Sequence, residues 1–237
     1  MAARLIYFLM IIAFIPGWVY AAPEALTDSR MTAEVILDGM THFDADQGLK
    51  DYKVKILEVT RETAKTDVTQ RDKVFYFMAP NVYLTMVGDK PETLSNDASF
   101  MLLLSQYELK REPDVEVRGE QCYKVIATPR DSAYKKYTKT YYVNKTDFHK
   151  TRIESIRSEM QYEFIKYQID FYYKEFEQGG SKILLVDKSE AVAYDNKGNV
   201  IMEQTNSYSS YEFNIGLTQS FFEGILKGYN TYFSEGT

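Results

Sequence analysis

Few side chains in this sequence could do chemistry, and they do not gather into a known catalytic pattern. The two histidines, His42 and His149, lie far apart, and neither has a second histidine one helical turn away, the spacing with which a helix binds zinc. A serine or cysteine nucleophile needs a base beside it, and no local pattern supplies one. We expect His149 in a surface turn. The sequence thus predicts no catalytic residue, no metal site and no cofactor, and a protein that is not an enzyme.

Two further patterns with ligand chemistry are incomplete. Asp44, Asp46 and Gly48 are similar to part of an oxygen-rich calcium loop, but the glutamate that would close such a loop is missing. Cys122 is the only cysteine, so the chain has no internal disulfide. Its apolar surroundings predict a small buried side chain rather than a reactive thiol.

The charge of the chain argues against nucleic acid as a partner. The net charge is −6, and it becomes −7 when Arg4 is removed with the leader described below, with both signs spread along the chain. Lys135, Lys136 and Lys139 form a small basic cluster. This cluster is either a solvated face or a contact for an anionic headgroup or partner.

The first residues have the pattern of a secretory signal peptide. A weakly positive start at Arg4 precedes the apolar run Leu5–Ile15, and Val19-Tyr20-Ala21 is a small-x-small cleavage site. The alternative is an uncleaved membrane anchor, for which the run is short. We therefore predict a signal peptide over residues 1–21 and one domain over residues 22–237. The protein is expected to be soluble in the periplasm.

The stretch Lys73–Val87 carries the strongest structural signal in the chain. It reads KVFYFMAPNVYLTMV, two runs of aromatic and β-branched residues that are typical of strands. Alternation places Phe75 and Phe77 on one face and Tyr76 on the other, and both faces are apolar. Pro80 cannot donate to a ladder, so it marks an edge, a bulge or a corner. A sheet that is apolar on both faces must be covered on both faces, or must hold an apolar ligand.

Helix and strand patterns fill the rest of the chain. Apolar periodicity predicts helices over Thr27–Phe43, Ala98–Tyr107 and Thr218–Lys227, the second of them as a buried helix or as a lid over an apolar space. A loop is expected over Gly88–Asp97, and a bulge after Ile56. Alternation predicts strands over Tyr52–Thr60, Asp114–Thr128 with an interruption at Gly119, Lys139–Asn144, Lys150–Arg157, Glu163–Phe176, Lys182–Tyr194, Asn199–Ser207 and Tyr208–Phe213. These elements indicate an α+β fold dominated by one antiparallel sheet.

The order of these elements resembles the periplasmic outer-membrane lipoprotein carriers (LolA) and their outer-membrane lipoprotein-sorting relatives, over nearly the whole chain after residue 21. VFYFMAPNVYL is similar to the family's aromatic strand–proline element, and ASFMLLLSQY to its short leucine-rich helix. GEQCYKVIATP and KTYYVNKTDFHKTRIESI resemble a strand and a strand–turn–strand of the sorting proteins, and YEFNIGLTQSFF their closing strand and phenylalanine pair. No single motif is specific, and their order and spacing carry the resemblance.

The resemblance implies an unclosed β-barrel, a strongly curved antiparallel sheet with short helices that cover the concave face and enclose a hydrophobic cavity. Proteins of this class carry the acyl chains of lipoproteins across the periplasm. One position departs from the family. In the carriers, the residue immediately before this proline is an arginine, and that arginine holds the helical lid shut. This chain has Ala79 at the same position. This chain therefore has no arginine latch at this position. A lipid-binding cavity does not require that latch.

Strand parity together with the resemblance predicts which side chains line the cavity. We expect the lining to comprise Tyr52, Val54, Ile56, Phe75, Phe77, Tyr83, Leu103, Ile153, Ile165, Tyr167, Ile169 and Phe171. The alternative, in which these side chains form a filled core, stays open.

The sequence therefore predicts a periplasmic protein that binds lipid or acylated lipoprotein cargo in this cavity and shuttles it toward the outer membrane. A membrane exporter or an outer-membrane receptor is a further candidate partner. Two other functions stay open on the same fold. One is an interaction module, such as an envelope sensor or an accessory subunit of a membrane exporter, and the other is an enzyme that uses the cavity as its active site.

Overall fold

The computed structural model describes residues 30–95, 103–159 and 162–225. The part of the chain from Thr32 onward forms one compact unit. Its elements are α1 (Ala33–Asp46), β1 (Asp51–Glu62), β2 (Val68–Met78), β3 (Val82–Val87), β4 (Lys90–Ser95), β5 (Tyr107–Val117), β6 (Glu120–Pro129), the short 3₁₀ helix η2 (Ser132–Tyr137), β7 (Lys139–Asn144), β8 (Lys150–Glu159), β9 (Tyr162–Gln178), β10 (Ser181–Tyr194) and β11 (Val200–Phe213). Residues 103–106 and 219–225 are also helical. No helix within these ranges has the length and apolar character needed to cross a membrane.

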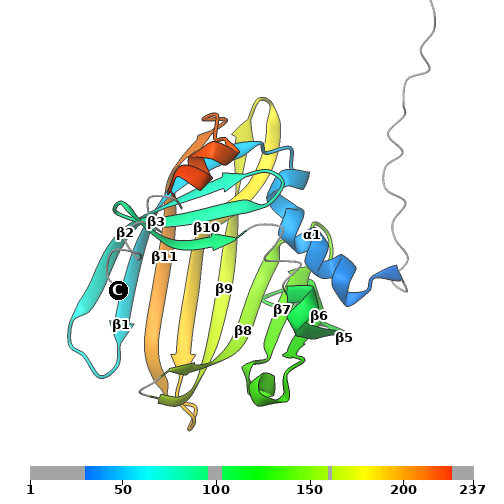
Figure 1. The fold of residues 1–237 in the computed structure, drawn as a ribbon, viewed down its shortest axis with the longest axis vertical. Helices are drawn as coiled ribbons and strands as arrows, with labels where there is room; N and C mark the ends of the chain where they lie inside the picture. The colour runs from blue at the N-terminus through cyan, green and yellow to red at the C-terminus, as the bar shows by residue number, and fades with distance from the viewer. Residues whose placement is uncertain (1–29, 96–102, 160–161, 226–237) are drawn as a thin grey trace, which may run out of the picture. The chain divides into compact units, whose positions relative to one another are not determined.

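The strands in the described ranges form one 11-stranded antiparallel sheet (Figure 1). Its order is β4-β3-β2-β1-β11-β10-β9-β8-β7-β6-β5. Consecutive strands are therefore paired except β4 and β5, and β1 and β11 are the only paired strands in the described residues that are not consecutive. The two edges, β4 and β5, do not pair with each other in the described part of the chain, so the sheet stays open. The predicted α+β class with one large unclosed antiparallel sheet is confirmed.

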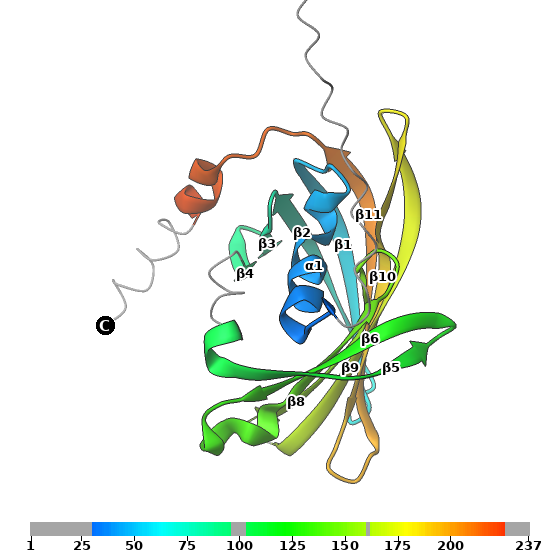
Figure 2. The ribbon, with the colours of Figure 1, turned by 90° about the vertical axis from the view of Figure 1, so that its right-hand side faces the viewer.

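The sheet is bent, and α1 lies on the inside of the bend (Figure 2). Thr32 caps this helix, because its Oγ1 accepts a hydrogen bond from the Val35 amide at 3.3 Å. The helix therefore begins later than the predicted Thr27. Ile36 and Leu37 are fully buried, whereas Val35 is 39% exposed. The buried stripe of α1 is thus narrower than its apolar residues suggest.

Close packing fixes α1 against the turn that leads into β8. A Cβ atom on Gly39 would lie 2.8 Å from the Phe148 ring, so this approach needs a glycine. Further along the helix, the Phe43 ring centroid lies 5.8 Å from that of Tyr173 on β9 and 6.0 Å from that of His149. These edge-on contacts hold the last turn of α1 over β8 and β9.

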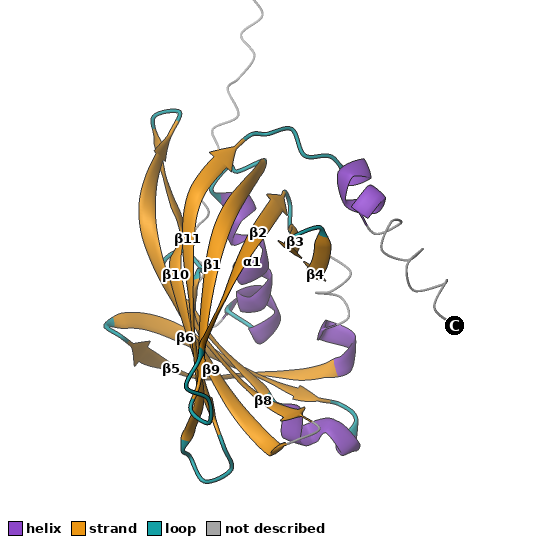
Figure 3. Ribbon diagram, turned by 90° about the vertical axis from the view of Figure 1, so that its left-hand side faces the viewer, coloured by secondary structure: helices purple, strands orange, loops and turns teal. Residues whose placement is uncertain are grey.

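The β2–β3 hairpin is apolar on both faces, as predicted, and both faces are covered. On the inner face, Phe77 is fully buried beside Tyr52. On the outer face, Leu84 and Met86 pack against Phe222. Helical residues 219–225 lie on the far side of β3 and β4 from α1 (Figure 3). The expectation that the short helices cover the concave face is therefore wrong for this one, which covers the convex face.

The β1 strand keeps its alternation where a bulge was expected. Its pairing with β2 runs without a shift from Asp51 opposite Met78 to Arg61 opposite Val68. The expected bulge after Ile56 is therefore wrong. The side chain of Glu58 consequently lies on the same face as Ile56, and Glu58 is only 2% exposed.

Both edge strands extend beyond the predicted elements. The expected loop Gly88–Asp97 contains β4, and β5 begins at Tyr107, well before the predicted Asp114. β11 is one strand where two were predicted. Of the predicted helix Ala98–Tyr107, residues 98–102 lie outside the described residues and residues 103–106 are helical.

Candidate functional site

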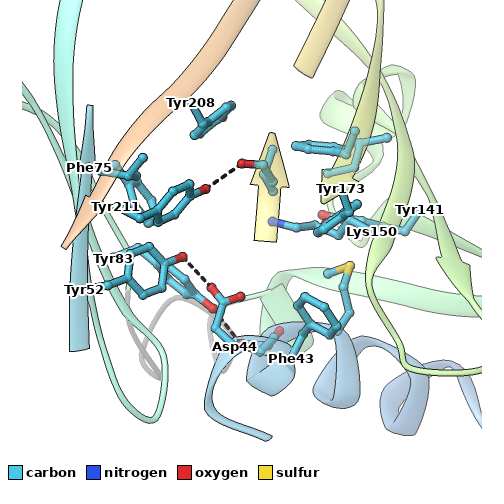
Figure 4. Close-up of a pocket in the computed structure, with 16 residues that line it drawn as sticks. Phe43, Asp44, Tyr52, Phe75, Tyr83, Tyr141, Lys150, Tyr173, Tyr208 and Tyr211 are labelled. Atoms are coloured by element: carbon cyan, nitrogen blue, oxygen red, sulfur yellow. Dashed lines mark hydrogen bonds between the residues drawn. The ribbon is translucent and has the colours of Figure 1, made fainter. Parts of the chain in front are cut away.

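A cavity of about 380 Å³ lies between α1 and the inner face of the sheet (Figure 4). This volume is within the range of small-molecule binding sites. Its wall takes side chains from eight strands and one helix, mostly aromatic and aliphatic: Met40, Thr41, Phe43, Asp44, Tyr52, Val54, Phe75, Tyr83, Tyr141, Lys150, Ile153, Phe171, Tyr173, Val186, Tyr208 and Tyr211.

Half of the predicted lining residues meet at this cavity. Tyr52, Val54, Phe75, Tyr83, Ile153 and Phe171 lie in its wall. Phe77 lies behind them, with its ring centroid 5.1 Å from that of Tyr52. Ile169 lines a neighbouring hollow of about 510 Å³, which shares Tyr141 and Ile153 with the cavity. The inner face therefore offers two adjoining spaces.

The other predicted residues do not reach the cavity wall. Tyr167 is buried against Ala193, further along β9. Ile56 is buried without lining the cavity, and Leu103 is half-buried in the short helical segment 103–106. The side chain of Ile165 is outside the described part of the structure. That all twelve residues contact a lipid remains a prediction.

A backbone irregularity in β11 adds two tyrosines that strand parity could not place. Ser210 has φ 56°, and the pairing of β11 with β1 shifts between Lys53 and Lys55. The extra residue of such a bulge reverses the alternation. Tyr208 and Tyr211, three positions apart, both line the cavity as a result.

Asp44 and Lys150 bring opposite charges into this mostly apolar space. The Tyr52 hydroxyl donates a hydrogen bond to Asp44 Oδ2 at 2.9 Å. Burial raises the pKa of Asp44 and outweighs the opposing effects of that hydrogen bond and of the Lys150 charge. Burial lowers the pKa of Lys150, and the charge of Asp44 offsets part of this effect. Burial also raises the pKa of Tyr173, so that its hydroxyl stays protonated and able to donate.

A second hydrogen bond joins α1 to the sheet at the cavity. The Tyr83 hydroxyl donates to the Thr41 carbonyl oxygen at 2.9 Å. With the Tyr52–Asp44 bond, it links one turn of the helix to β1 and β3. At the position of the carriers' latch arginine, the Ala79 amide donates to the Lys50 carbonyl oxygen at 2.8 Å. Two tyrosine hydroxyls thus join α1 to the sheet.

A polar network around the buried side chains of His149 and Thr151 positions the start of β8, next to Lys150. Glu120 Oε2 accepts hydrogen bonds from Asn144 Nδ2 at 2.9 Å and Thr151 Oγ1 at 3.0 Å, and lies 2.8 Å from His149 Nε2. His149 Nδ1 lies 2.6 Å from Asp147 Oδ1. Each ring nitrogen of His149 therefore lies beside a carboxylate oxygen. His149 is only 6% exposed, so the expectation of a surface turn residue is wrong.

We expect Glu120→Gln to lower the free energy of unfolding by about 1–2 kcal/mol at neutral pH. This loss is smaller than for a fully buried carboxylate, because Glu120 is partly exposed and solvent screens its charge. Burial raises the pKa of Glu120, but the hydrogen bonds from Asn144 and Thr151 and the charge of His149 together lower it below its usual 4.5. A carboxyl group with a lowered folded-state pKa stabilises the fold above its unfolded-state pKa, and this stabilisation is lost as the pH falls through the folded-state value.

The difference between wild type and Glu120→Gln should therefore shrink below about pH 4.5. Urea unfolding followed by circular dichroism at neutral and acidic pH measures it. Glu116→Gln is the matched control, because Glu116 is exposed on the neighbouring strand. An equal loss of stability at both pH values would show that the charge on Glu120 is not what matters.

Beyond the cavity, the inner face becomes polar. Lys73 Nζ lies 2.7 Å from Glu58 Oε2 and 2.6 Å from Glu92 Oε2. Gln204 Nε2 donates to Glu58 Oε2 at 2.9 Å. Glu58 and Lys73 are both buried. The apolar part of the inner face therefore ends next to Ile56.

The comparisons with known proteins concern the fold alone. No family model matches the sequence, and no curated protein matches it. Among solved structures, an outer membrane lipoprotein-sorting protein domain from Vibrio parahaemolyticus is similar, with 12% identity, a TM-score of 0.56 and coverage of 82% of this chain and 97% of that one. A DUF1329 family protein from Desulfovibrio piger is similar with 14% identity, a TM-score of 0.51 and coverage of 81% and 97%.

A LolA superfamily protein from Nitrosomonas europaea is more distant, with 12% identity, coverage of 81% of this chain and 97% of that one, and a TM-score of 0.46. The assignment of the fold depends on the other two structures, which share most of their length with this chain. The resemblance that the order of motifs predicted is confirmed at the level of the fold. The chain has the fold of this outer membrane lipoprotein-sorting protein domain and of the DUF1329 family protein.

Proposed function

We propose that this protein binds the acyl chains of a lipid or lipoprotein in its cavity and carries them through the periplasm toward the outer membrane. The observation that carries the proposal is the space of about 380 Å³ beneath α1, walled by aromatic and aliphatic side chains, in a fold similar to a lipoprotein-sorting domain. A close-packed protein core has few voids larger than a water molecule, so a space of this volume is not typical of a filled core.

The energetics of a hydrocarbon tail support a carrier with such a cavity. Each methylene removed from water contributes about 0.8 kcal/mol, so a tail of ~16 carbons contributes on the order of 12 kcal/mol. A tail therefore crosses water slowly unless a protein offers a comparable apolar environment. The carrier must also release its cargo, so its cavity should bind the tail no more tightly than the accepting membrane or receptor. Met40 and the rings of Phe75 and Phe171 provide an adaptable wall for this purpose.

We expect lipid to co-purify with the protein when it is isolated from a bacterial periplasm without detergent. The measurement is organic extraction followed by mass spectrometry, together with native mass spectrometry of the intact complex. Phospholipid or an acylated peptide near one molecule per chain is the expected result. A protein that is empty after isolation, and that binds no acyl-chain probe in solution, would contradict the proposal.

An interaction module is the second candidate, and the open edges of the sheet favour it. Both β4 and β5 have one edge without a strand partner in the described residues, and such an edge can pair with a strand of another protein. Recovery of an empty protein bound to a membrane partner would favour this candidate.

We also propose that the protein is not an enzyme. In support, the cavity wall in the described residues contains no histidine, cysteine or serine to act as base or nucleophile.

A further inference from the structure

Lys150 is the polar group of the cavity that the fold itself does not use. It is the first residue of β8, and its ammonium group points into the cavity (Figure 4). Within the described residues, its ammonium group forms no hydrogen bond and no ion pair. Its closest favourable contact is the face of the Phe171 ring, whose centroid lies 5.2 Å from Nζ. The three N–H groups of a lysine ammonium therefore face the open space.

The surroundings of Lys150 make this arrangement costly unless something else occupies the cavity. A charged group away from bulk water needs a counter-charge and hydrogen-bond acceptors. Asp44 supplies part of the charge from across the cavity, but its Oδ2 is occupied by the Tyr52 hydroxyl and it does not form an ion pair with Lys150. A cation–π contact replaces little of the lost hydration. The network around His149 nevertheless holds the neighbouring backbone in place.

The apolar and polar groups of the cavity are arranged as an amphiphile would require. Phe75, Ile153 and Phe171 provide surface for a hydrocarbon tail, and Lys150 provides a cation within the same wall. We propose that the ligand of this cavity is an anionic amphiphile, whose carboxylate or phosphate binds Lys150 while its acyl chain lies on the aromatic wall.

This inference rests on the proposed function, and the choice of probes separates the two. Hexadecanoate, hexadecyl phosphate and 1-hexadecanol have the same tail and differ in their head, so competition with a fluorescent acyl-chain probe compares the heads directly. We expect the wild type to bind at least one of the two anions at least about tenfold more tightly than the alcohol, the effect of one charge-assisted hydrogen bond. Whichever anion binds more tightly identifies the head. Inorganic phosphate and acetate should not compete, because they lack the tail.

Lys150→Met keeps the length of the side chain and removes its charge. We expect this variant to bind 1-hexadecanol as the wild type does and to lose the preference for the anions. Lys150→Arg should retain the preference. Lys55→Met is the matched control, because Lys55 is exposed on β1 and does not line the cavity.

Two results would overturn the inference, and they are distinguishable. If the wild type binds all three probes equally, or if Lys150→Met weakens all three equally, the protein binds acyl chains but Lys150 does not select their heads. If none of the three displaces the probe or binds, the proposed function fails together with the inference. The comparison within the wild type needs no variant, so a Lys150→Met protein that does not fold would still leave the inference testable.

Discussion

Phe77→Ala should lower the free energy of unfolding by about 3–5 kcal/mol, which is a large part of the stability of a domain of this size. The side chain is fully buried in a core cluster with Tyr52 and Val54. Its ring centroid lies 5.1 Å from that of Tyr52 and 5.4 Å from that of Tyr83. These two tyrosines hold α1 through hydrogen bonds to Asp44 and Thr41, so the loss should loosen the helix as well. Urea unfolding followed by circular dichroism measures the change.

Phe77→Leu is the matched control, because it keeps most of the apolar volume and should cost less than about 1.5 kcal/mol. Hydrogen exchange gives a second measurement. The amides of α1 should exchange faster in Phe77→Ala than in Phe77→Leu. Equal stabilities of the two variants would mean that the β2–β3 hairpin is not packed as the rings indicate.

Ile153→Trp should weaken the binding of acyl-chain ligands by about 50- to 100-fold with little loss of stability. Ile153 borders both the cavity and the neighbouring hollow. An indole there would occupy the space of roughly three methylenes of a tail, which corresponds to about 2.4 kcal/mol of binding free energy. Because the ring enters open space, overpacking of the fold should be small. Titration with a fluorescent acyl-chain probe measures the affinity.

The variant carries its own reporter of where the new side chain lies. Trp18 is the only tryptophan of the sequence and falls in the predicted signal peptide, so a protein expressed from Ala22 has no other indole. Blue-shifted emission would place the new ring in the cavity. Leu57→Trp is the control, because Leu57 is 41% exposed on the outer face of β1 and should leave binding unchanged. If Ile153→Trp binds the probe as the wild type does and its emission is blue-shifted, the acyl chain does not bind beside Ile153.

Alternation predicted the central strands well because each has one face in the core. It failed at the two edge strands for a common physical reason. Both contain a proline, Pro91 in β4 and Pro113 in β5. Proline is tolerated on an edge strand, where its missing N–H can face outward. The pairing shifts at both places, between Thr85 and Met86 and between Glu112 and Val115. Sequence alone does not reveal which strands will be edges.

The sequence could predict only those residues of the candidate cavity that are apolar and that lie on the inner face of a strand by alternation. Tyr52, Phe75 and Phe171 were found because apolar residues on one face of a strand share a direction. Asp44 and Lys150 were missed because a search for an apolar lining excludes charged residues. They come from two elements that only the fold brings together, and no short-range pattern links them. The positive φ of Ser210, which turns Tyr208 and Tyr211 to one side, has no signal in a pair of serines.

The ion-paired band of Glu58, Lys73 and Glu92 sets a length scale for whatever enters the hollow. A tail that followed the sheet past Ile56 would have to separate the buried charges of Glu58 and Lys73, at a cost that further methylenes could not offset. The ion pairs at this end of the inner face therefore limit the length of the tail that the face can hold. Among amphiphiles with the same head, those whose tails end before these ion pairs should fit, and longer ones should have to fold back or protrude.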